Sequence, residues 1–299
     1  MDDFSRGADD TELAGLAERD EVGVSIRDLT LPDALDDVGQ DYDYIFHLAA
    51  IVGVGRVLEA PYQVLDANVT MTQNVISAAR GQRSLKRFGF LSTSEVYAGS
   101  LERIELPLPT PESAPLVVPD LSRPRTSYML SKVYGEALCH HAEIPFTIFR
   151  PHNVYGPRMG FAHVIPELLQ RADQAPNGGE LEVYSVNHRR TFCYVEDAVE
   201  LLVRAVRSSA CVGKTLNIGV EEPEISIGEL AQLVIATVGK SLTIVPRPPT
   251  PGSPERRCPD MSMTTALTGF TAAVELETGV RRTYEWYRSA ALPRSAPVH

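Results

Sequence analysis

Short apolar runs alternate with amphipathic segments along most of this chain. Apolar strands are predicted at residues 22–26, 44–50, 87–92, 146–150, 181–186, 215–218 and 242–245. Helices with apolar positions every three or four residues are predicted at residues 33–38, 61–79, 127–141, 164–172, 195–207 and 226–238. Strands that alternate with helices favour a parallel sheet joined by right-handed crossovers. The pattern therefore predicts an α/β fold built on a doubly wound parallel sheet.

The alternation becomes less regular after residue 157. Residues 195–207 nevertheless have the spacing of a helix that returns to the main sheet. Ser226 is a suitable N-cap for a later helix, and Glu229 completes a capping box three residues on. We predict two units: a larger sheet domain formed by residues 1–157 and 191–220, and a smaller α/β lobe formed by residues 158–190 and 221–299.

Composition and charge limit the partners of the protein. The 299 residues are 43% hydrophobic and 22% charged, which is ordinary for a globular protein with one or two packed domains. The net charge of −11 argues against binding to nucleic acid or to an anionic membrane surface. A phosphorylated ligand would therefore need local arginines that oppose the overall sign.

The cysteines and the amino terminus indicate a cytoplasmic protein. The four cysteines are far apart and form no CxxC pair, which fits reduced thiols and argues against a metal site. No apolar run reaches membrane-spanning length, and the acidic start is unlike a signal peptide.

One pair of segments carries candidate chemistry. Tyr128 and Lys132 are four residues apart at the start of a predicted helix, so they share a helix face. A lysine ammonium at this distance favours the phenolate and lowers the pKa of the tyrosine from about 10. Thr93 follows the end of a buried strand and offers a hydroxyl to the same reacting oxygen. Such a group can take a proton from a substrate alcohol while a hydride leaves the carbon.

The strand end Thr93-Ser94-Glu95, followed after a gap by Tyr128-x-x-x-Lys132, resembles the extended short-chain dehydrogenase/reductase family. The resemblance is to its nucleotide-sugar epimerases, dehydratases and decarboxylases, and it runs from residue 1 to about residue 290. It implies a Rossmann-like larger domain that binds NAD and a smaller lobe that binds a nucleoside diphosphate sugar. It also implies a homodimer and a catalytic set of Thr93, Ser94, Glu95, Tyr128 and Lys132.

The resemblance assigns further residues to the cofactor. The expected cofactor-binding residues are Asp2, Asp28, Leu29, Leu48, Ala49, Ala50, Asn68, Ser92, Tyr128, Lys132, Pro151, Asn153 and Val154. Some have a simpler interpretation: Asp28 as a cap of a turn, Asn68 as an exposed polar residue, and residues 48–50 as ordinary strand packing. His47, within an apolar run, is expected to be a core histidine.

The sequence lacks the glycine-rich turn that normally holds a dinucleotide diphosphate at a helix N-terminus. Relative to the family pattern, the first strand, its glycine-rich loop and the first helix are absent, and Asp2 stands near the end of the second strand. The strand at 44–50 is then expected to have an unpaired edge. Three explanations stay open: a late start or trimmed chain, a partner segment that fills the gap, or a fold that has lost its cofactor.

The resemblance also assigns the substrate site. Asn153, in Arg-Pro-His-Asn-Val-Tyr-Gly-Pro, resembles the residue that contacts the sugar nucleotide, and His163-Val164 resembles the pair whose backbone meets the phosphates. Arg190 and Arg257 resemble the two diphosphate-site arginines, and in decarboxylases the second lies near the sugar carboxylate. Guanidinium groups suit a diphosphate because they donate paired hydrogen bonds. Surface charge is the simpler interpretation of both.

The residues beside Thr93 bear on the reaction. Ser94 departs from the Asp of dTDP-glucose dehydratases, whereas Thr-Ser-Glu is similar to UDP-glucuronate decarboxylases and to GDP-mannose dehydratases. The resemblance therefore implies oxidation of the sugar at C4 to a 4-keto intermediate, with decarboxylation of a UDP-glucuronate-type substrate favoured. The alternatives are a nucleotide-sugar 4-epimerase and a catalytically silent nucleotide-sugar-binding protein without the cofactor loop.

Overall fold

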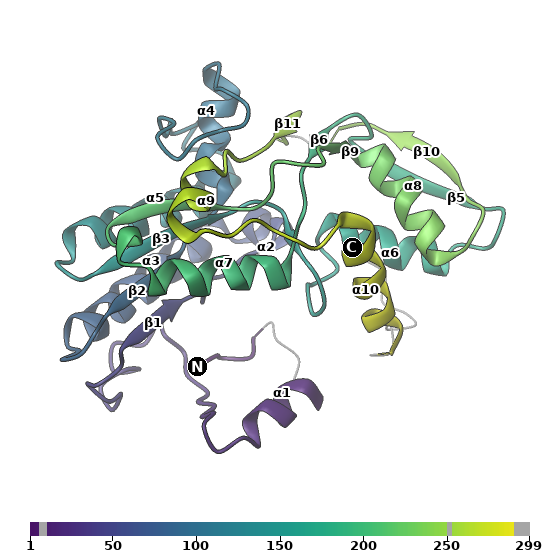
Figure 1. The fold of residues 1–299 in the computed structure, drawn as a ribbon. Helices are drawn as coiled ribbons and strands as arrows, with labels where there is room; N and C mark the ends of the chain where they lie inside the picture. The colour runs from purple at the N-terminus through teal and green to yellow at the C-terminus, as the bar shows by residue number, and fades with distance from the viewer. Residues whose placement is uncertain (6–10, 250–252, 290–299) are drawn as a thin grey trace.

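Four parallel strands form the centre of the computed structural model, which describes residues 1–5, 11–249 and 253–289 (Figure 1). In spatial order they are β1 (Tyr44–His47), β2 (Arg87–Leu91), β3 (Phe146–Pro151) and β8 (Lys214–Ile218). Every neighbouring pair in this sheet is parallel, as the alternation of strands and helices predicted.

Helices cover both faces of the sheet (Figure 1). On one face α3 (Pro61–Arg80) packs against α5 (Pro124–His141), and on the other lie α7 (Val195–Arg207) and α9 (Ser262–Thr268). Phe90 and Ile148 are fully buried under α3 and α5, whereas Phe149, the next residue of β3, is fully buried on the opposite side. This alternation gives each face its own apolar core, and the predicted doubly wound α/β fold is confirmed.

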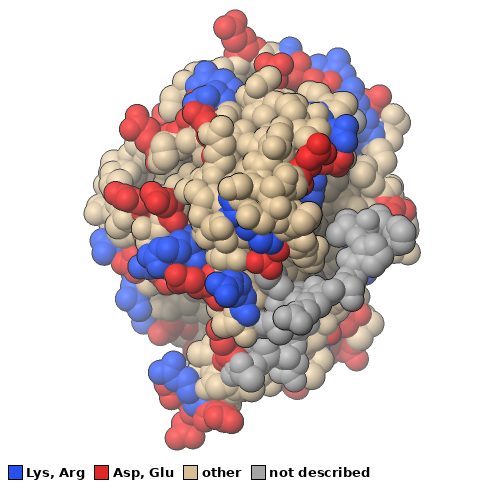
Figure 2. Space-filling view, turned by 90° about the vertical axis from the view of Figure 1, so that its right-hand side faces the viewer, with Lys and Arg blue, Asp and Glu red and all other residues tan. Residues whose placement is uncertain are grey.

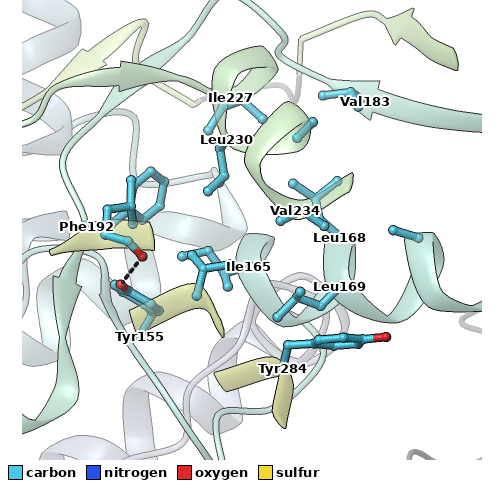
Figure 3. Close-up of a cluster of buried hydrophobic side chains, with 14 of the residues drawn as sticks. Tyr155, Ile165, Leu168, Leu169, Val183, Phe192, Ile227, Leu230, Val234 and Tyr284 are labelled. Carbon is cyan, nitrogen blue, oxygen red and sulfur yellow. Dashed lines mark hydrogen bonds between the residues drawn. The ribbon is translucent and has the colours of Figure 1, made fainter. Parts of the chain in front are cut away.

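A second group of elements forms its own core. They are α6 (Val164–Gln174), β5 (Glu180–Tyr184), α8 (Ile227–Val238), β10 (Thr243–Arg247) and α10 (Leu276–Ser289). Figure 3 shows apolar side chains of α6 and α8 between Tyr155 and Phe192 on one side and Val183 of β5 on the other. The predicted capping box is confirmed, because Ser226 Oγ accepts from Glu229 N and the Glu229 carboxylate accepts from Ser226 N. The residue ranges given to the two units stay a prediction.

Shorter elements connect these parts. They are α1 (Thr11–Ala17), α2 (Val54–Glu59), α4 (Ala98–Arg103), the 3₁₀ turns η1 (Ser94–Tyr97) and η2 (Ser209–Cys211), and the two-residue strands β4 (Val154–Tyr155), β6 (Arg189–Arg190), β7 (Cys193–Tyr194), β9 (Ile225–Ser226) and β11 (Arg256–Arg257).

Figure 2 shows acidic and basic side chains interspersed around an uncharged area on one side of the molecule. None of the described helices combines membrane-spanning length with an apolar sequence.

Two predicted elements near the amino terminus are wrong. Residues 22–26 form no strand, because only Ile26 makes a parallel bridge, to Asp2. Residues 33–38 form successive turns rather than a helix, with hydrogen bonds that span three residues. The strand predicted at 44–50 ends at His47, and the helix predicted at 127–141 already begins at Pro124. A proline at the first helical position is favourable because it has no N–H to satisfy.

The strand β1 lies at the edge of the sheet. Within the described residues it pairs only with β2. Tyr44 and Phe46 of β1 are 39% and 40% exposed and Leu48 just after it is 52% exposed, whereas His47 is buried against Thr72. The expectations of an open edge and of a core histidine are therefore confirmed.

Replacement of Gly135 tests the close approach of α5 to the sheet. A Cβ at Gly135 would lie 2.3 Å from Phe90 Cζ, so Gly135→Ala is expected to lower the free energy of unfolding by about 1–3 kcal/mol. Gly55→Ala in α2 is the matched control, because its added Cβ meets nothing within 4 Å. Urea unfolding measures both, and equal stability of the two variants would contradict this packing.

Candidate active site

The segment after β2 turns immediately into η1 at the carboxyl edge of the sheet. Thr93 has an extended backbone, and its Oγ1 accepts a hydrogen bond from Glu95 N at 3.2 Å. Thr93 and Ser94 are both buried. The hydroxyl of Thr93 thus caps the turn and fixes the direction in which Glu95 leaves the sheet.

Tyr128 and Lys132 reach the same edge from α5. Lys132 Nζ donates to the carbonyl oxygen of Leu91 at 2.8 Å and lies 6.0 Å from the centre of the Tyr128 ring. The lysine is 5% exposed, and burial lowers its pKa to about 8 even though the charge of Glu136 opposes the shift. Tyr128 itself is half-buried. The structure therefore places the predicted phenol and ammonium beside the end of β2.

Glu95 lies between two arginines. Its Oε1 accepts from Arg257 Nη1 at 2.9 Å, and its Oε2 accepts from Arg125 Nη2 at 3.2 Å. Burial raises the pKa of Glu95, but the charges of Arg257 and Arg125 outweigh burial, and the net pKa is lowered. Glu95 is therefore ionised at neutral pH. Arg257 Nη1 also lies 3.4 Å from Ser94 Oγ, so the predicted residues Ser94, Glu95 and Arg257 come together.

The sequence interpretation missed Arg125. It lies three residues before Tyr128 on α5, so the two share a helix face. That spacing was the available signal, but an arginine on an amphipathic helix is usually solvated. Only the contact with Glu95, which the sequence pattern does not reveal, distinguishes Arg125 from a solvated arginine.

A buried network of polar side chains surrounds Glu136, one turn after Lys132 on α5. Arg150 Nη2 and Glu136 Oε2 are 2.6 Å apart, and both side chains are less than a tenth exposed. Ser92 Oγ donates to Glu136 Oε1 at 2.5 Å, and Arg150 Nη1 donates to Tyr97 OH at 2.7 Å. The hydroxyl of Ser92, expected to face the cofactor, is thus engaged by Glu136. Glu136 lies one turn after Lys132 on α5 and pairs with Arg150 through both of its oxygens.

His152 is buried in the same region. Its Nε2 lies 3.1 Å from Asn217 Oδ1, and its Nδ1 is buried without a partner among the described residues. Burial, and then the charge of Arg257, lower the pKa of His152 to about 3. The imidazole is therefore neutral at physiological pH.

A neighbouring pocket of about 210 Å³ contains most of the predicted substrate residues. Asn153, Val164 and Arg190 line it, together with apolar side chains such as Phe192. Asn153 has φ of 43°, and its Nδ2 donates to the carbonyl oxygen of Thr191 at 2.9 Å. Such a backbone conformation is uncommon but tolerated by asparagine. Val154, the next residue, pairs in β4 with Cys193 of β7.

His163 precedes a helix that begins at this pocket, whereas Arg190 lines the pocket with its side chain. His163 is the N-cap residue of α6, so the first N–H groups of that helix follow it. Arg190 donates to Ser253 Oγ at 3.0 Å and to the carbonyl oxygens of Arg189 at 2.7 Å and Glu255 at 3.1 Å. Burial, and then the charge of Arg257, lower the pKa of Arg190 to about 10. Its guanidinium fixes the segment before β11 and also lines the pocket.

Three of the expected cofactor-binding residues, Asp2, Asp28 and Leu29, lie near the amino terminus and are either exposed or engaged in local contacts. Asp2 is exposed, and Asp28 accepts from Thr30 N at 2.9 Å and from Thr30 Oγ1 at 2.6 Å, as a turn cap does. Leu29 is buried in the core, and its carbonyl accepts from Asn74. Its backbone and side chain are therefore both engaged.

Asn68 links the loop after β1 to the helices. It is buried, so the interpretation as an exposed residue is wrong. Its Oδ1 accepts from Ile51 N at 2.7 Å, and its Nδ2 donates to Ile51 O at 3.1 Å. A further contact of 3.3 Å joins Asn68 Nδ2 to Ser131 Oγ on α5.

The reacting end of a nicotinamide cofactor fits this edge of the sheet. Leu48, Ala49 and Ala50 follow β1 with side chains that are exposed or half-buried, and Pro151 ends β3 half-buried. Lys132 Nζ is buried at the end of the neighbouring strand β2, where it donates to the carbonyl oxygen of Leu91. The cofactor diphosphate has no glycine-rich turn in the sequence to receive it. The fit therefore concerns the nicotinamide end.

Comparison with known proteins identifies the relatives of this chain. Residues 7–219 match a family described as the NAD dependent epimerase/dehydratase family. The UDP-N-acetyl-alpha-D-glucosaminuronate decarboxylase of Bacillus cytotoxicus is 32% identical over 280 residues, which cover 89% of this chain and 82% of that protein. A probable UDP-glucuronate 4-epimerase of Rhizobium meliloti is 28% identical over 269 residues, which cover 82% and 74% respectively.

A solved structure is similar along most of its length. The UDP-glucuronic acid 4-epimerase of Bacillus cereus, in complex with UDP-glucuronic acid and NAD, matches with a TM-score of 0.71 and 26% identity. The match covers 88% of this chain and 79% of that one. The prediction of NAD as the cofactor is confirmed at the level of the family by its description.

The neutral state of His152 predicts a pH dependence. Between the ordinary pKa of 6.5 and the folded-state pKa of about 3, the unfolded chain binds a proton that the folded chain does not. The free energy of unfolding therefore falls as the pH drops through this window. His152→Gln is expected to reduce that slope by up to about 1.4 kcal/mol per pH unit.

Urea unfolding at a series of pH values measures the slope. His47→Gln is the matched comparison, because burial also lowers the pKa of His47 to about 3. Both variants should show shallower acid destabilisation than the unmodified chain. A slope unchanged by His152→Gln would show that this imidazole is protonated in the folded state.

Proposed function

This chain belongs to the NAD-dependent epimerase/dehydratase family, and we propose that it oxidises a nucleoside diphosphate sugar at C4 and decarboxylates a UDP-glucuronate-type substrate. The observation that carries the proposal is the contact of Glu95 with Arg257, close to the end of β2 where Tyr128 and Lys132 lie. A guanidinium at this place gives a carboxylated sugar a partner that a neutral sugar does not need.

Tyr128 is the proposed base for the C4 hydroxyl. The Lys132 ammonium favours the phenolate, and Thr93 offers a hydroxyl to the same oxygen. NAD, when bound, supplies a reversible acceptor for the C4 hydride. Leu48, Ala49, Ala50 and Lys132 would hold its nicotinamide end.

The proposed loss of carbon dioxide follows from the 4-keto sugar. The C6 carboxylate is then β to the ketone, so the C5–C6 bond can break and its electron pair can pass into an enolate at C4. Thr93 and Tyr128 would donate hydrogen bonds to that enolate oxygen, which stabilises the developing charge. A proton added at C5 completes the loss of carbon dioxide. Return of the hydride to C4, with a proton from Tyr128 to the C4 oxygen, would then restore the alcohol. Arg257 would orient the carboxylate before the bond breaks.

The pocket lined by Asn153, Val164 and Arg190 is the proposed nucleotide site. Its volume of about 210 Å³ and its mixture of apolar and polar walls suit a base and ribose. The start of α6 at Val164 would face the diphosphate, because helix N-termini attract anions. Arg190 would add a cation there.

A 4-epimerase is the second candidate. It is favoured by the relatives from Rhizobium meliloti and Bacillus cereus, whose names describe 4-epimerases of a carboxylated sugar. Such an enzyme keeps the carboxylate and returns the hydride to the other face of C4. A catalytically silent nucleotide-sugar-binding protein is the third candidate. The homodimer and the cytoplasmic location remain predictions.

Incubation of the full chain with NAD and UDP-glucuronate tests the proposal. We expect release of carbon dioxide and a product lighter by that mass, detected by mass spectrometry. Tyr128→Phe should slow this reaction by at least about a hundredfold, because it removes the proposed base. Tyr134→Phe on the same helix is the matched control, since Tyr134 is 40% exposed and contacts Gln73.

The other outcomes separate the candidates. A product of unchanged mass with inverted C4 would support the 4-epimerase. Binding of UDP-glucuronate without any product, and without NAD released on denaturation of the purified protein, would support the silent binder.

A further inference from the structure

The carboxylate of Glu95 is shared between two elements that are distant in sequence. One oxygen accepts from Arg257 of β11 and the other from Arg125 of α5. The Glu95 side chain is 25% exposed, and those of Arg257 and Arg125 are 11% and 29% exposed. Each guanidinium therefore contacts a different oxygen, and one can leave while the other stays.

Positive charge is in excess at this place. Arg190 is close enough for its pKa to be lowered by the charge of Arg257 and raised by that of Glu95. Two guanidinium groups thus contact one carboxylate, and the charges of Arg257 and Glu95 both act on Arg190 nearby, in a protein whose net charge is −11. Arg257 Nε is also buried without a partner within the described part of the chain. The cluster is therefore suited to receive another anion at Arg257.

An anion that reaches Arg257 must compete with Glu95. If Glu95 had no second partner, its displacement would leave a largely buried carboxylate without a countercharge, which is unfavourable. Arg125 prevents this, because its contact is with the oxygen that faces away from Arg257. Its position on α5, one turn before Tyr128, keeps it in place during the exchange.

We propose that Arg125 is a positioning residue that retains Glu95 while Arg257 transfers to the carboxylate of the bound sugar. This inference rests on the proposed function, because it assumes a nucleotide sugar in the site. A sugar with a neutral hydroxymethyl group cannot replace Glu95 at Arg257. The exchange therefore favours a carboxylated sugar over its neutral counterpart.

Binding of UDP-glucuronate and UDP-glucose, measured by calorimetry without turnover, tests the inference. Without Arg125, Glu95 should hold Arg257 more firmly. Arg125→Gln is therefore expected to weaken UDP-glucuronate binding by about tenfold and UDP-glucose binding by less than about twofold. Arg125→Lys should restore part of the selectivity. Arg123→Gln is the matched control, because Arg123 pairs with the exposed Glu102 and should change neither affinity.

A double-mutant cycle with Glu95→Gln separates positioning from direct contact. Glu95→Gln alone should release Arg257 and tighten UDP-glucuronate binding relative to UDP-glucose. In that background Arg125→Gln should alter UDP-glucuronate binding by less than about twofold. An equal loss in both backgrounds would mean that Arg125 contacts the sugar itself, and would overturn the inference.

The remaining outcomes are also decisive. If Arg125→Gln does not fold, Glu95→Gln still tests the exchange, and weaker UDP-glucuronate binding by that variant would overturn it. A chain that releases carbon dioxide but shows no effect of Arg125 on selectivity would overturn the inference and leave the proposed function standing. A chain that binds neither nucleotide sugar would overturn both.

Discussion

The contact between Glu95 and Arg257 is the interaction on which the rest of the site depends. It ties the turn after β2 to β11 and so joins the carboxyl edge of the central sheet to the segment that Arg190 fixes. It also holds a carboxylate in its charged form despite burial. Because Thr93 caps the same turn, the position of Glu95 and that of the neighbouring hydroxyl are set together.

The site concentrates charge that the protein as a whole does not have. The pair of Glu136 with Arg150 and the ammonium of Lys132 lie beneath the reacting edge, where water is largely excluded. Charges in such surroundings interact more strongly than they do in solvent, provided that each has a partner. The Glu136–Arg150 pair and Lys132 thus hold buried charges beside this edge of the sheet in a protein that is acidic as a whole.

The sequence predicted the elements that are specified by residues only a few positions apart. The helix at 195–207 and the capping box at Ser226 follow from apolar spacing and cap chemistry within a few residues. The strand predicted at 22–26 failed because a strand needs neighbours, and Ile26 has only a single bridge to Asp2. Asn68 and Arg125 have partners on other elements, and those partners are invisible in the local pattern. The roles given to the site residues stay predictions.

A crystal structure of the chain soaked with UDP-glucuronate tests the central claim most directly, because it shows which carboxylate Arg257 holds. We expect that Arg257 contacts the sugar carboxylate, that Glu95 remains with Arg125, and that the C4 hydroxyl faces Tyr128. A sugar carboxylate turned toward solvent, with Arg257 still on Glu95, would contradict it.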